Sequence, residues 1–181
     1  ALNFTGPKAE TFEVVIQFGA ILAVIVLYWP RFWGLLRPKK EQAFSGLRGI
    51  WLLILTTLPG ACLGVLFHST IKSLFSPSTV AMAFVVGAIL MLVVEGWFSR
   101  HPQQAPLETV DQIQPKHALG IGFFQCLAMW PGFSRSASTI MGGMLLGLKR
   151  EVAAEYSFLA AVPMIVGAAG YDLIKSLDLL S

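Results

Sequence analysis

Charged residues are scarce in this sequence. Only 13% of its 181 residues are Asp, Glu, Lys or Arg, whereas about a quarter are charged in a typical soluble domain. Hydrophobic residues make up 55%, and the mean hydropathy is +0.69. This composition excludes an ordinary soluble domain and predicts a single integral membrane domain over residues 1–181.

Cysteine is almost absent as well. Cys62 and Cys126 both lie inside apolar segments, where a thiol usually serves as a small buried hydrophobic group. Two cysteines in such positions exclude a disulfide framework, and their spacing is not that of a metal site.

Basic residues exceed acidic ones by only three, and the pI is about 9.0. Lys and Arg gather in short segments between apolar runs, above all between Arg31 and Arg48. Such basic loops are typically cytoplasmic and orient a protein in the bilayer. We therefore expect these basic residues to lie at the surface of the bilayer, and we expect no nucleic-acid partner.

Four apolar runs are close to the ~20 residues that a helix needs to cross a bilayer. They cover residues 11–29, 49–67, 79–98 and 152–174. Pro30 is expected to end the first, together with Arg31, and Pro59 to kink the second. Thr56 and Thr57 can then hydrogen-bond to backbone carbonyls near the kink. These runs predict an all-α, multi-pass membrane protein.

A fifth apolar stretch, residues 117–148, is broken by Pro131-Gly132 and contains Arg135. An arginine in hydrocarbon costs ~2.5 to 3.5 kcal/mol or more. Broken backbone at membrane depth is tolerated where protein covers it or where it lines a watery cavity. Polar or basic segments flank both ends of the stretch, so both ends are expected on the cytoplasmic side. We interpret it as a re-entrant pair of half-helices.

The elbow between the half-helices, residues 130–139, is a candidate anion site. Ser134 can cap the second half-helix and leave free backbone N–H groups at its amino end. Arg135 adds a planar fork suited to phosphate oxygens, and Ser136 and Thr139 add hydroxyl donors. Gln125 can hydrogen-bond into the elbow, or its amide can be satisfied by neighbours.

The small residues after the elbow have a simpler interpretation. Gly142, Gly143 and Gly147 follow Arg135 within the second half-helix and its end. Small residues let the backbones of membrane helices approach closely. We therefore expect these three glycines to serve helix packing and Arg135 to serve function.

An internal similarity suggests an inverted repeat. Residues 12–19 and 154–161 align without gaps, each with a glutamate, Glu13 or Glu155, near the start of an apolar helix. The first of these helices would run inward and the second outward, as in inverted-topology repeats. Chance similarity between two apolar helices is the alternative. If the repeat is real, a first broken segment precedes residue 1, and we expect this chain to be part of a longer protein.

The elbow resembles a known signature. Residues 131–139, Pro-Gly-Phe-Ser-Arg-Ser-Ala-Ser-Thr, match the PGxSRSxxT pattern of the undecaprenyl pyrophosphate phosphatase family, the bacitracin-resistance type, of bacterial inner membranes. Residues 12–17, 67–75, 124–128 and 155–158 also resemble that family, so the resemblance covers nearly the whole chain.

The resemblance implies hydrolysis of the terminal phosphate of a polyprenyl pyrophosphate, which recycles the carrier lipid for cell-wall synthesis. It also implies a helical fold of inverted repeats with paired re-entrant elements. Arg135, Ser134, Ser136 and Thr139 would bind the pyrophosphate, and the first three are our candidate catalytic residues. The family's glutamate-rich motif, with its serine pair and histidine, has no counterpart here, and neither do its last helices. A divalent cation, Mg²⁺ or Ca²⁺, would therefore have its ligands outside this chain.

Two other functions remain as alternatives. A transporter or flippase could use the same elbow to bind an anionic head group without cleaving it, and it would need no acidic or nucleophilic motif. A structural membrane subunit without a ligand would leave Arg135 unexplained. The sequence is compatible with a homo-oligomer.

Overall fold

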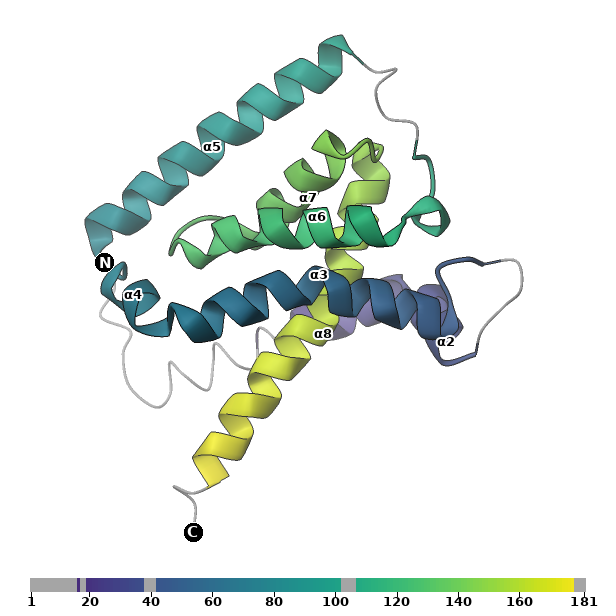
Figure 1. Ribbon diagram of the computed structural model, residues 1–181, viewed down its shortest axis with the longest axis horizontal. Helices are drawn as coiled ribbons and strands as arrows, with labels where there is room; N and C mark the ends of the chain where they lie inside the picture. The colour runs from purple at the N-terminus through teal and green to yellow at the C-terminus, as the bar shows by residue number, and fades with distance from the viewer. Residues whose placement is uncertain (1–15, 17–18, 38–41, 102–106, 178–181) are drawn as a thin grey trace.

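A computed structural model describes residues 16, 19–37, 42–101 and 107–177 (Figure 1). Over these ranges the chain is helical or irregular and contains no β-strand, which confirms the all-α class. Glu13 and Gln17 lie outside the described residues, so the similarity between residues 12–19 and 154–161 stays a prediction. A first helix, Gly19–Leu27, precedes the labelled elements. These are α2 (Trp29–Leu36), α3 (Gly46–Leu66), α4 (His68–Ser73), α5 (Pro77–Arg100), η2 (Val110–Gln112), α6 (Pro115–Gln125), η3 (Cys126–Met129), α7 (Arg135–Leu145) and α8 (Arg150–Leu177).

Within the described residues, two unbroken helices, α3 and α5, are long and apolar enough to cross a membrane, with mean hydropathies of 2.0 and 2.3. Only 28% of the most apolar window of α3, and 11% of that of α5, is buried inside the protein. Many of their large apolar side chains, Leu47, Val65 and Leu92 among them, are instead exposed. A helix that is apolar on its outer face is adapted to lipid rather than water. Long apolar helices are thus confirmed at the predicted spans 49–67 and 79–98, while their passage through a bilayer stays a prediction.

Local sequence chemistry sets the bounds of these two helices. The Ser76 hydroxyl accepts the Thr79 N–H at 3.3 Å, and Pro77 occupies the first turn of α5, where its missing N–H is not needed. In α3 the Thr56 and Thr57 hydroxyls donate to the carbonyls of Leu52 and Leu53 at 3.0 and 2.9 Å, as expected. The helix α3 continues through Pro59.

The first span ends close to the predicted residue 29, but the expected stop by Pro30 and Arg31 is wrong. The helix Gly19–Leu27 stops before Tyr28, and the chain bends by 80° into α2, which begins at Trp29. Pro30 therefore lies in the first turn of a new helix rather than after the last turn of an old one. Proline is favoured there because its backbone nitrogen has no partner to lose. Arg31, expected in a loop, is helical.

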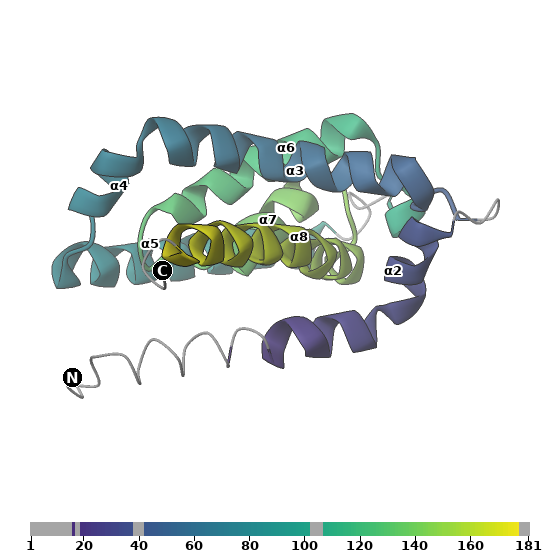
Figure 2. The same cartoon turned by 90° about the horizontal axis from the view of Figure 1, so that it is seen from below.

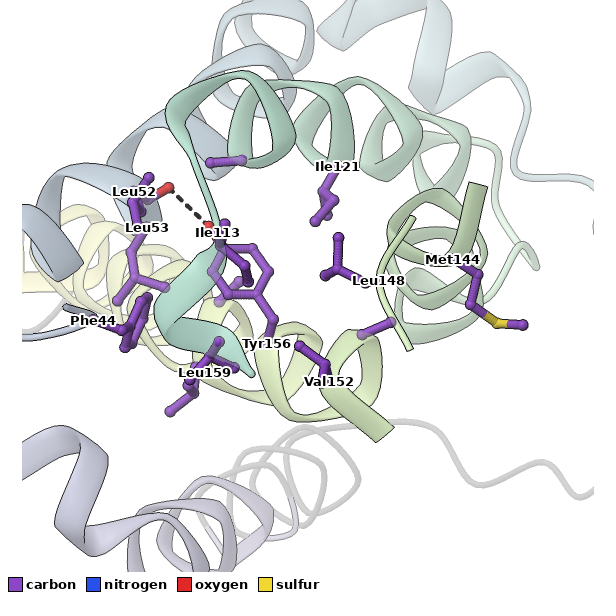
Figure 3. Close-up of a cluster of buried hydrophobic side chains, with 14 of the residues drawn as sticks. Phe44, Leu52, Leu53, Ile113, Ile121, Met144, Leu148, Val152, Tyr156 and Leu159 are labelled. Atoms are coloured by element: carbon purple, nitrogen blue, oxygen red, sulfur yellow. Dashed lines mark hydrogen bonds between the residues drawn. The ribbon is translucent and has the colours of Figure 1, made fainter. Parts of the chain in front are cut away.

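Figure 2 shows α3 and α6 side by side in one layer and α7 and α8 in the next, while α5 is set apart in Figure 1. Buried apolar side chains from α3, α6, α7, α8 and the segment around η2 meet in one core (Figure 3). Tyr156, at the centre of this core, is fully buried. Its hydroxyl lies 2.7 Å from the Thr56 hydroxyl and donates to the Leu52 carbonyl at 3.1 Å, so it ties α8 to α3.

A charged network ties α2 to the same core. Arg31 Nε donates to Glu155 at 2.9 Å, and Arg31 Nη1 donates to Asp111 at 3.0 Å. The other Asp111 oxygen accepts the Phe44 N–H at 2.6 Å. All three charged side chains are about a quarter exposed, so water screens the pairs only in part. One guanidinium thus connects α2, η2 and α8.

The helices α6 and α7 form a hairpin whose two ends meet. The Leu107 N–H donates to the Gly147 carbonyl at 3.1 Å, and the Lys149 N–H donates to the Leu107 carbonyl at 3.0 Å. The chain therefore enters and leaves the hairpin at one place. This is the geometry expected of a re-entrant element, while its position relative to the bilayer, and its proposed bounds of 117–148, stay predictions.

The glycines of the hairpin have two different roles. A Cβ on Gly142 would lie 2.5 Å from Phe124 Cβ, and one on Gly143 would lie 2.9 Å from Ala153 Cβ, so both serve close packing as expected. Gly147 instead has a φ of 91° just after α7. Its N–H bonds to the Met144 carbonyl and that of Leu148 to the Gly143 carbonyl, a Schellman motif. The turn therefore requires the left-handed backbone of Gly147, and the packing role expected for this glycine stays a prediction.

Candidate functional site

The predicted break in the hairpin is present. Helix α6 ends at Gln125, η3 continues to Met129, and α7 starts at Arg135, so residues 130–134 form the non-helical part of the elbow. Gly132 has a φ of +97°, and a Cβ there would lie 2.5 Å from the Val80 carbonyl oxygen. Only glycine fits this position, because both the backbone angle and the contact with α5 exclude a side chain.

The elbow is anchored on α5 by one aromatic ring. Phe133 is 6% exposed and packs in a small cluster with Ala83 of α5 and with Ala137 and Met141 of α7. A Cβ on Gly87 would lie 3.4 Å from the Phe133 ring, so α5 leaves room for it. The elbow is thus held between two helices far apart in the sequence, and this fixes where α7 begins.

Ser134 caps α7, as predicted. Its hydroxyl accepts the Ala137 N–H at 3.4 Å, and its carbonyl accepts both the N–H and the hydroxyl of Ser138, at 3.0 and 2.9 Å. The hydroxyls of Ser134 and Ser136 lie 3.2 Å apart on the exposed side of this first turn. The amino end of α7 therefore combines two hydroxyl groups with the positive end of a helix dipole.

Arg135 is partly buried at this amino end. Its Nη1 atom is buried and has no hydrogen-bond partner among the described residues. Such a group is rare in a folded protein and calls for an explanation. Arg135 lines a cavity of about 380 Å³ enclosed by residues of α3, η3 and α8, among them Thr57, Met129 and Met164. The guanidinium of Arg135 is therefore the main positive charge beside this cavity.

Gln125 faces the same cavity from the end of α6. The side chain is only 4% exposed, yet its Oε1 atom has no hydrogen-bond partner among the described residues. One of the two expectations for Gln125 is that neighbouring groups satisfy its amide. The carbonyl oxygen does not meet this expectation among the described residues. Two unsatisfied polar side chains from different helices, Arg135 and Gln125, thus line one cavity, and both were among the predicted site residues.

Thr139 lies deeper. It is 1% exposed, and its hydroxyl donates to the Arg135 and Ser136 carbonyls, both at 3.1 Å, while lying 2.6 Å from the Ser157 hydroxyl. Contact of Thr139 with a phosphate stays a prediction. Its present contacts hold the first turn of α7 against α8.

Sequence reasoning missed two polar groups around the site. Ser157, 1% exposed on α8, supports Thr139 from behind. The indole N–H of Trp130, in the elbow itself, is buried without a partner in the described structure. The sequence does hold one indication of a role for Ser157, which directly follows Glu155 and Tyr156 on an apolar helix.

The described residues do not fit a divalent cation. They contain no group of three or more His, Cys, Asp or Glu side chains that could hold a metal ion. The lining of the Arg135 cavity offers side-chain oxygens only from Thr57 and Gln125, without a carboxylate. Mg²⁺ and Ca²⁺ require several oxygen ligands, usually including carboxylates, so this part of the protein does not form their site.

The whole chain, residues 1–181, matches the family model described as bacitracin resistance protein BacA. It is 64% identical over 181 residues to an undecaprenyl-diphosphatase of Nitratidesulfovibrio vulgaris (strain DP4). It is 61% identical over 181 residues to that of Maridesulfovibrio salexigens, and 58% identical over 180 residues to that of Lawsonia intracellularis. Each match covers 99% of this chain and 67% of the relative. The elbow signature, the helical fold and these matches agree: the chain belongs to the bacitracin resistance protein BacA family.

Proposed function

We propose that this protein hydrolyses undecaprenyl pyrophosphate to the monophosphate, with Arg135 and the amino end of α7 binding the pyrophosphate. The names of the relatives support the reaction, since three undecaprenyl-diphosphatases share 58% to 64% of its residues. The apolar helices α3 and α5 fit a membrane enzyme with a lipid substrate. Recycling of this carrier lipid serves cell-wall synthesis.

One observation carries the assignment of the site: Arg135 Nη1 is buried beside a cavity without a partner. A guanidinium in the wall of this cavity would donate to an anion bound there. Phosphate oxygens suit its planar fork, and the amino end of a helix is a second ready anion site. Together they would neutralise charge on the transferring phosphoryl group, where phosphoryl-transfer enzymes act.

The other predicted residues complete the binding site. Ser134 and Ser136 present their hydroxyls next to the free N–H groups of α7 and would donate to phosphate oxygens. Gln125 brings an amide whose carbonyl oxygen is unpaired, and it would bind a water or a protonated phosphate oxygen. Thr139 would position Arg135 through the hydrogen bond from its hydroxyl to the Arg135 carbonyl. It would contact a phosphate only if the first turn of α7 opened.

Cleavage requires a group that activates the attacking water. The described lining of the Arg135 cavity contains neither a carboxylate nor a histidine. We therefore propose that this group, and the ligands of any Mg²⁺ or Ca²⁺ ion, come from another part of the protein. The relatives are longer than this chain, which spans 67% of their length.

We place the protein in the bacterial inner membrane as a multi-pass protein. The long apolar helices and the basic loops support this location. A homo-oligomer, and the absence of a nucleic-acid partner, stay predictions. The transporter alternative receives no support from the relatives, all three of which are named as diphosphatases.

Phosphate release from undecaprenyl pyrophosphate by the full-length protein in detergent tests the proposal. Arg135→Ala should lower kcat/KM by about 10²-fold or more, as for the loss of one preorganised donor. Arg135→Lys should retain part of the activity, because it keeps the charge but loses the fork. Arg100→Ala, at the exposed end of α5, is the matched control and should remain close to normal.

Near-normal turnover by Arg135→Ala in an extractable, folded protein would refute the role of Arg135. Tight binding of the lipid by the wild type without any phosphate release would instead favour the transporter.

A further inference from the structure

A second, larger cavity lies beside the Arg135 cavity. Its volume is about 600 Å³, and α2, α3 and α8 form its walls through residues such as Leu35, Leu53, Ile54, Leu58 and Val162. Every residue in its lining is apolar except Thr57, whose hydroxyl is bonded to the Leu53 carbonyl. We call it the apolar groove. Its size falls within the range of small-molecule sites, about 300 to 1,000 Å³.

The apolar groove and the Arg135 cavity adjoin. Thr57 and Ala61 of α3 and Pro163 of α8 line both. On one side of this shared wall lie Arg135 and Gln125 with their unpaired polar atoms. On the other side the lining is apolar throughout, so the two cavities together have the polarity of an amphiphile with an anionic head.

The apolar groove is open to the surroundings of the protein. Among its lining residues, Ile54, Leu58 and Val166 are between 47% and 54% exposed, and Leu36 is 74% exposed. Two of these residues belong to α3, one of the helices suited to cross a membrane. An exposed apolar surface of this kind marks a contact with lipid, ligand or protein. In the bilayer, the groove would therefore be accessible to a hydrocarbon chain from the side.

We propose that the apolar groove binds the isoprenoid chain of the substrate beyond its first unit, while the head group occupies the Arg135 cavity. This proposal rests on the proposed function, because it takes the substrate to be a polyprenyl pyrophosphate.

The groove acts by orientation rather than by hydrophobic burial. A polyprenyl chain is already surrounded by hydrocarbon in the membrane, so its transfer into the groove gains little. What it gains is a fixed direction, which places the pyrophosphate against Arg135 and α7. Holding a reacting group in place removes part of the entropic barrier to reaction. Obstruction of the groove should therefore harm long substrates and spare those too short to reach it.

Two obstructed variants of the full-length protein test this. Ile54→Trp and, separately, Leu58→Phe enlarge exposed lining residues that face the groove and not the Arg135 cavity. With undecaprenyl pyrophosphate, kcat/KM should fall about tenfold, a typical penalty for misfit in an apolar pocket. With isopentenyl pyrophosphate, which has one isoprene unit, kcat/KM should stay within about twofold of the wild type. Normal turnover of the short substrate also shows that each variant is folded.

The matched control is Ile89→Trp on α5, an equally exposed isoleucine that lines neither cavity. It should leave both substrates unaffected. A series of prenyl pyrophosphates should also show that obstruction harms longer chains more than shorter ones.

Three results would overturn the proposal. If the obstructed variants cleave the long substrate normally, the chain lies elsewhere and the groove faces ordinary bilayer lipid. If they lose both substrates equally, the groove is a structural contact, for instance with another segment of the full-length protein. If the wild type cleaves neither substrate, the proposed function fails, and this proposal fails with it.

Discussion

The hydroxyl oxygens of Thr139 and Ser157 lie 2.6 Å apart, and both side chains are 1% exposed. The single Thr139 proton is directed at the backbone carbonyls of Arg135 and Ser136, so Ser157 is the natural donor between the two hydroxyls. Ser157 thereby supports the turn of α7 that carries Arg135. A residue of α8, outside the elbow, thus helps to position the site.

Removal of the Ser157 hydroxyl tests this support. Ser157→Ala should lower the free energy of unfolding by about 1 kcal/mol, the usual net value of one buried hydrogen bond. It should also lower kcat more than it raises KM, because Arg135 remains present but is less well placed. Chemical unfolding in detergent and steady-state phosphate release measure the two effects. Ser78→Ala, an exposed serine on α5, is the control.

Thr139 gives a second measure of the same relationship. Thr139→Ser keeps the hydroxyl and should retain most activity, whereas Thr139→Val keeps the shape and should lose it. Equal activity of these two variants would show that the hydroxyl pair has no part in positioning Arg135.

Gly132 should tolerate no side chain. Gly132→Ala would place a Cβ 2.5 Å from the Val80 carbonyl oxygen and would hold alanine at a φ of +97°. We expect a loss of unfolding free energy of at least about 1 to 3 kcal/mol, with phosphate release lowered as the elbow shifts. The control is Gly96→Ala on α5, where a new Cβ would have nothing within 4 Å and alanine favours the helix. Equal stability of both variants would contradict the tight contact between the elbow and α5.

The hydrogen bonds of Leu107 with Gly147 and Lys149 close the base of the hairpin. This closed base predicts a labelling pattern in the membrane. After Cys62 and Cys126 are replaced by alanine, single cysteines at Lys116 and Glu151 should react from the same side. Both positions are exposed, at the start of α6 and of α8 respectively. A cysteine at the exposed Ser73, between α3 and α5, should react only from the other side. Labelling of positions 116 and 151 from opposite sides would show that the hairpin crosses the bilayer.

Acid should weaken the base of the hairpin. Glu108, just before η2, accepts a hydrogen bond from Lys149. This hydrogen bond, and then the lysine charge, lower the pKa of Glu108 below the usual 4.5. Because the pKa is lower in the folded state, the pair stabilises the protein above the unfolded-state pKa. That contribution disappears as the pH falls through the folded-state pKa.

Glu108→Gln removes this titration. The unfolding temperature of the variant in detergent should therefore depend less on pH in the acid range than that of the wild type. The effect should be small and should shrink in high salt, since both side chains are exposed. An identical acid dependence of the two proteins would mean that the pair does not stabilise the hairpin.

Local chemistry made the helices and the elbow predictable. Pro131-Gly132 cannot continue a helix, Ser134 is a good cap, and long apolar runs form the helices α3 and α5. For the same reason Arg135 stood out, because a guanidinium in an apolar run needs a local partner or a ligand. Two of the five predicted site residues, Arg135 and Gln125, indeed line one cavity.

Contacts between segments that are distant in the sequence could not be predicted from local sequence chemistry. The burial of Thr139 against Ser157 depends on which face of α7 meets α8. The network of Arg31 joins residues 80 and 124 positions away, so the sequence around Arg31 showed only a basic loop. Pro30 was misinterpreted because proline both follows helices and begins them, and only the 80° bend decides between the two.

The closed base of the hairpin also bears on how the protein is made. An arm of 11 residues, such as α6 or α7, is only roughly 16 Å long, about half the hydrocarbon thickness of a bilayer. Neither arm can therefore be threaded through the membrane as an ordinary span during synthesis. With Leu107 bonded to Gly147 and Lys149, both arms can enter together from one face as a folded wedge. The first turn of α7, which carries Arg135, would then enter already capped by Ser134, and no basic flank would have to be translocated.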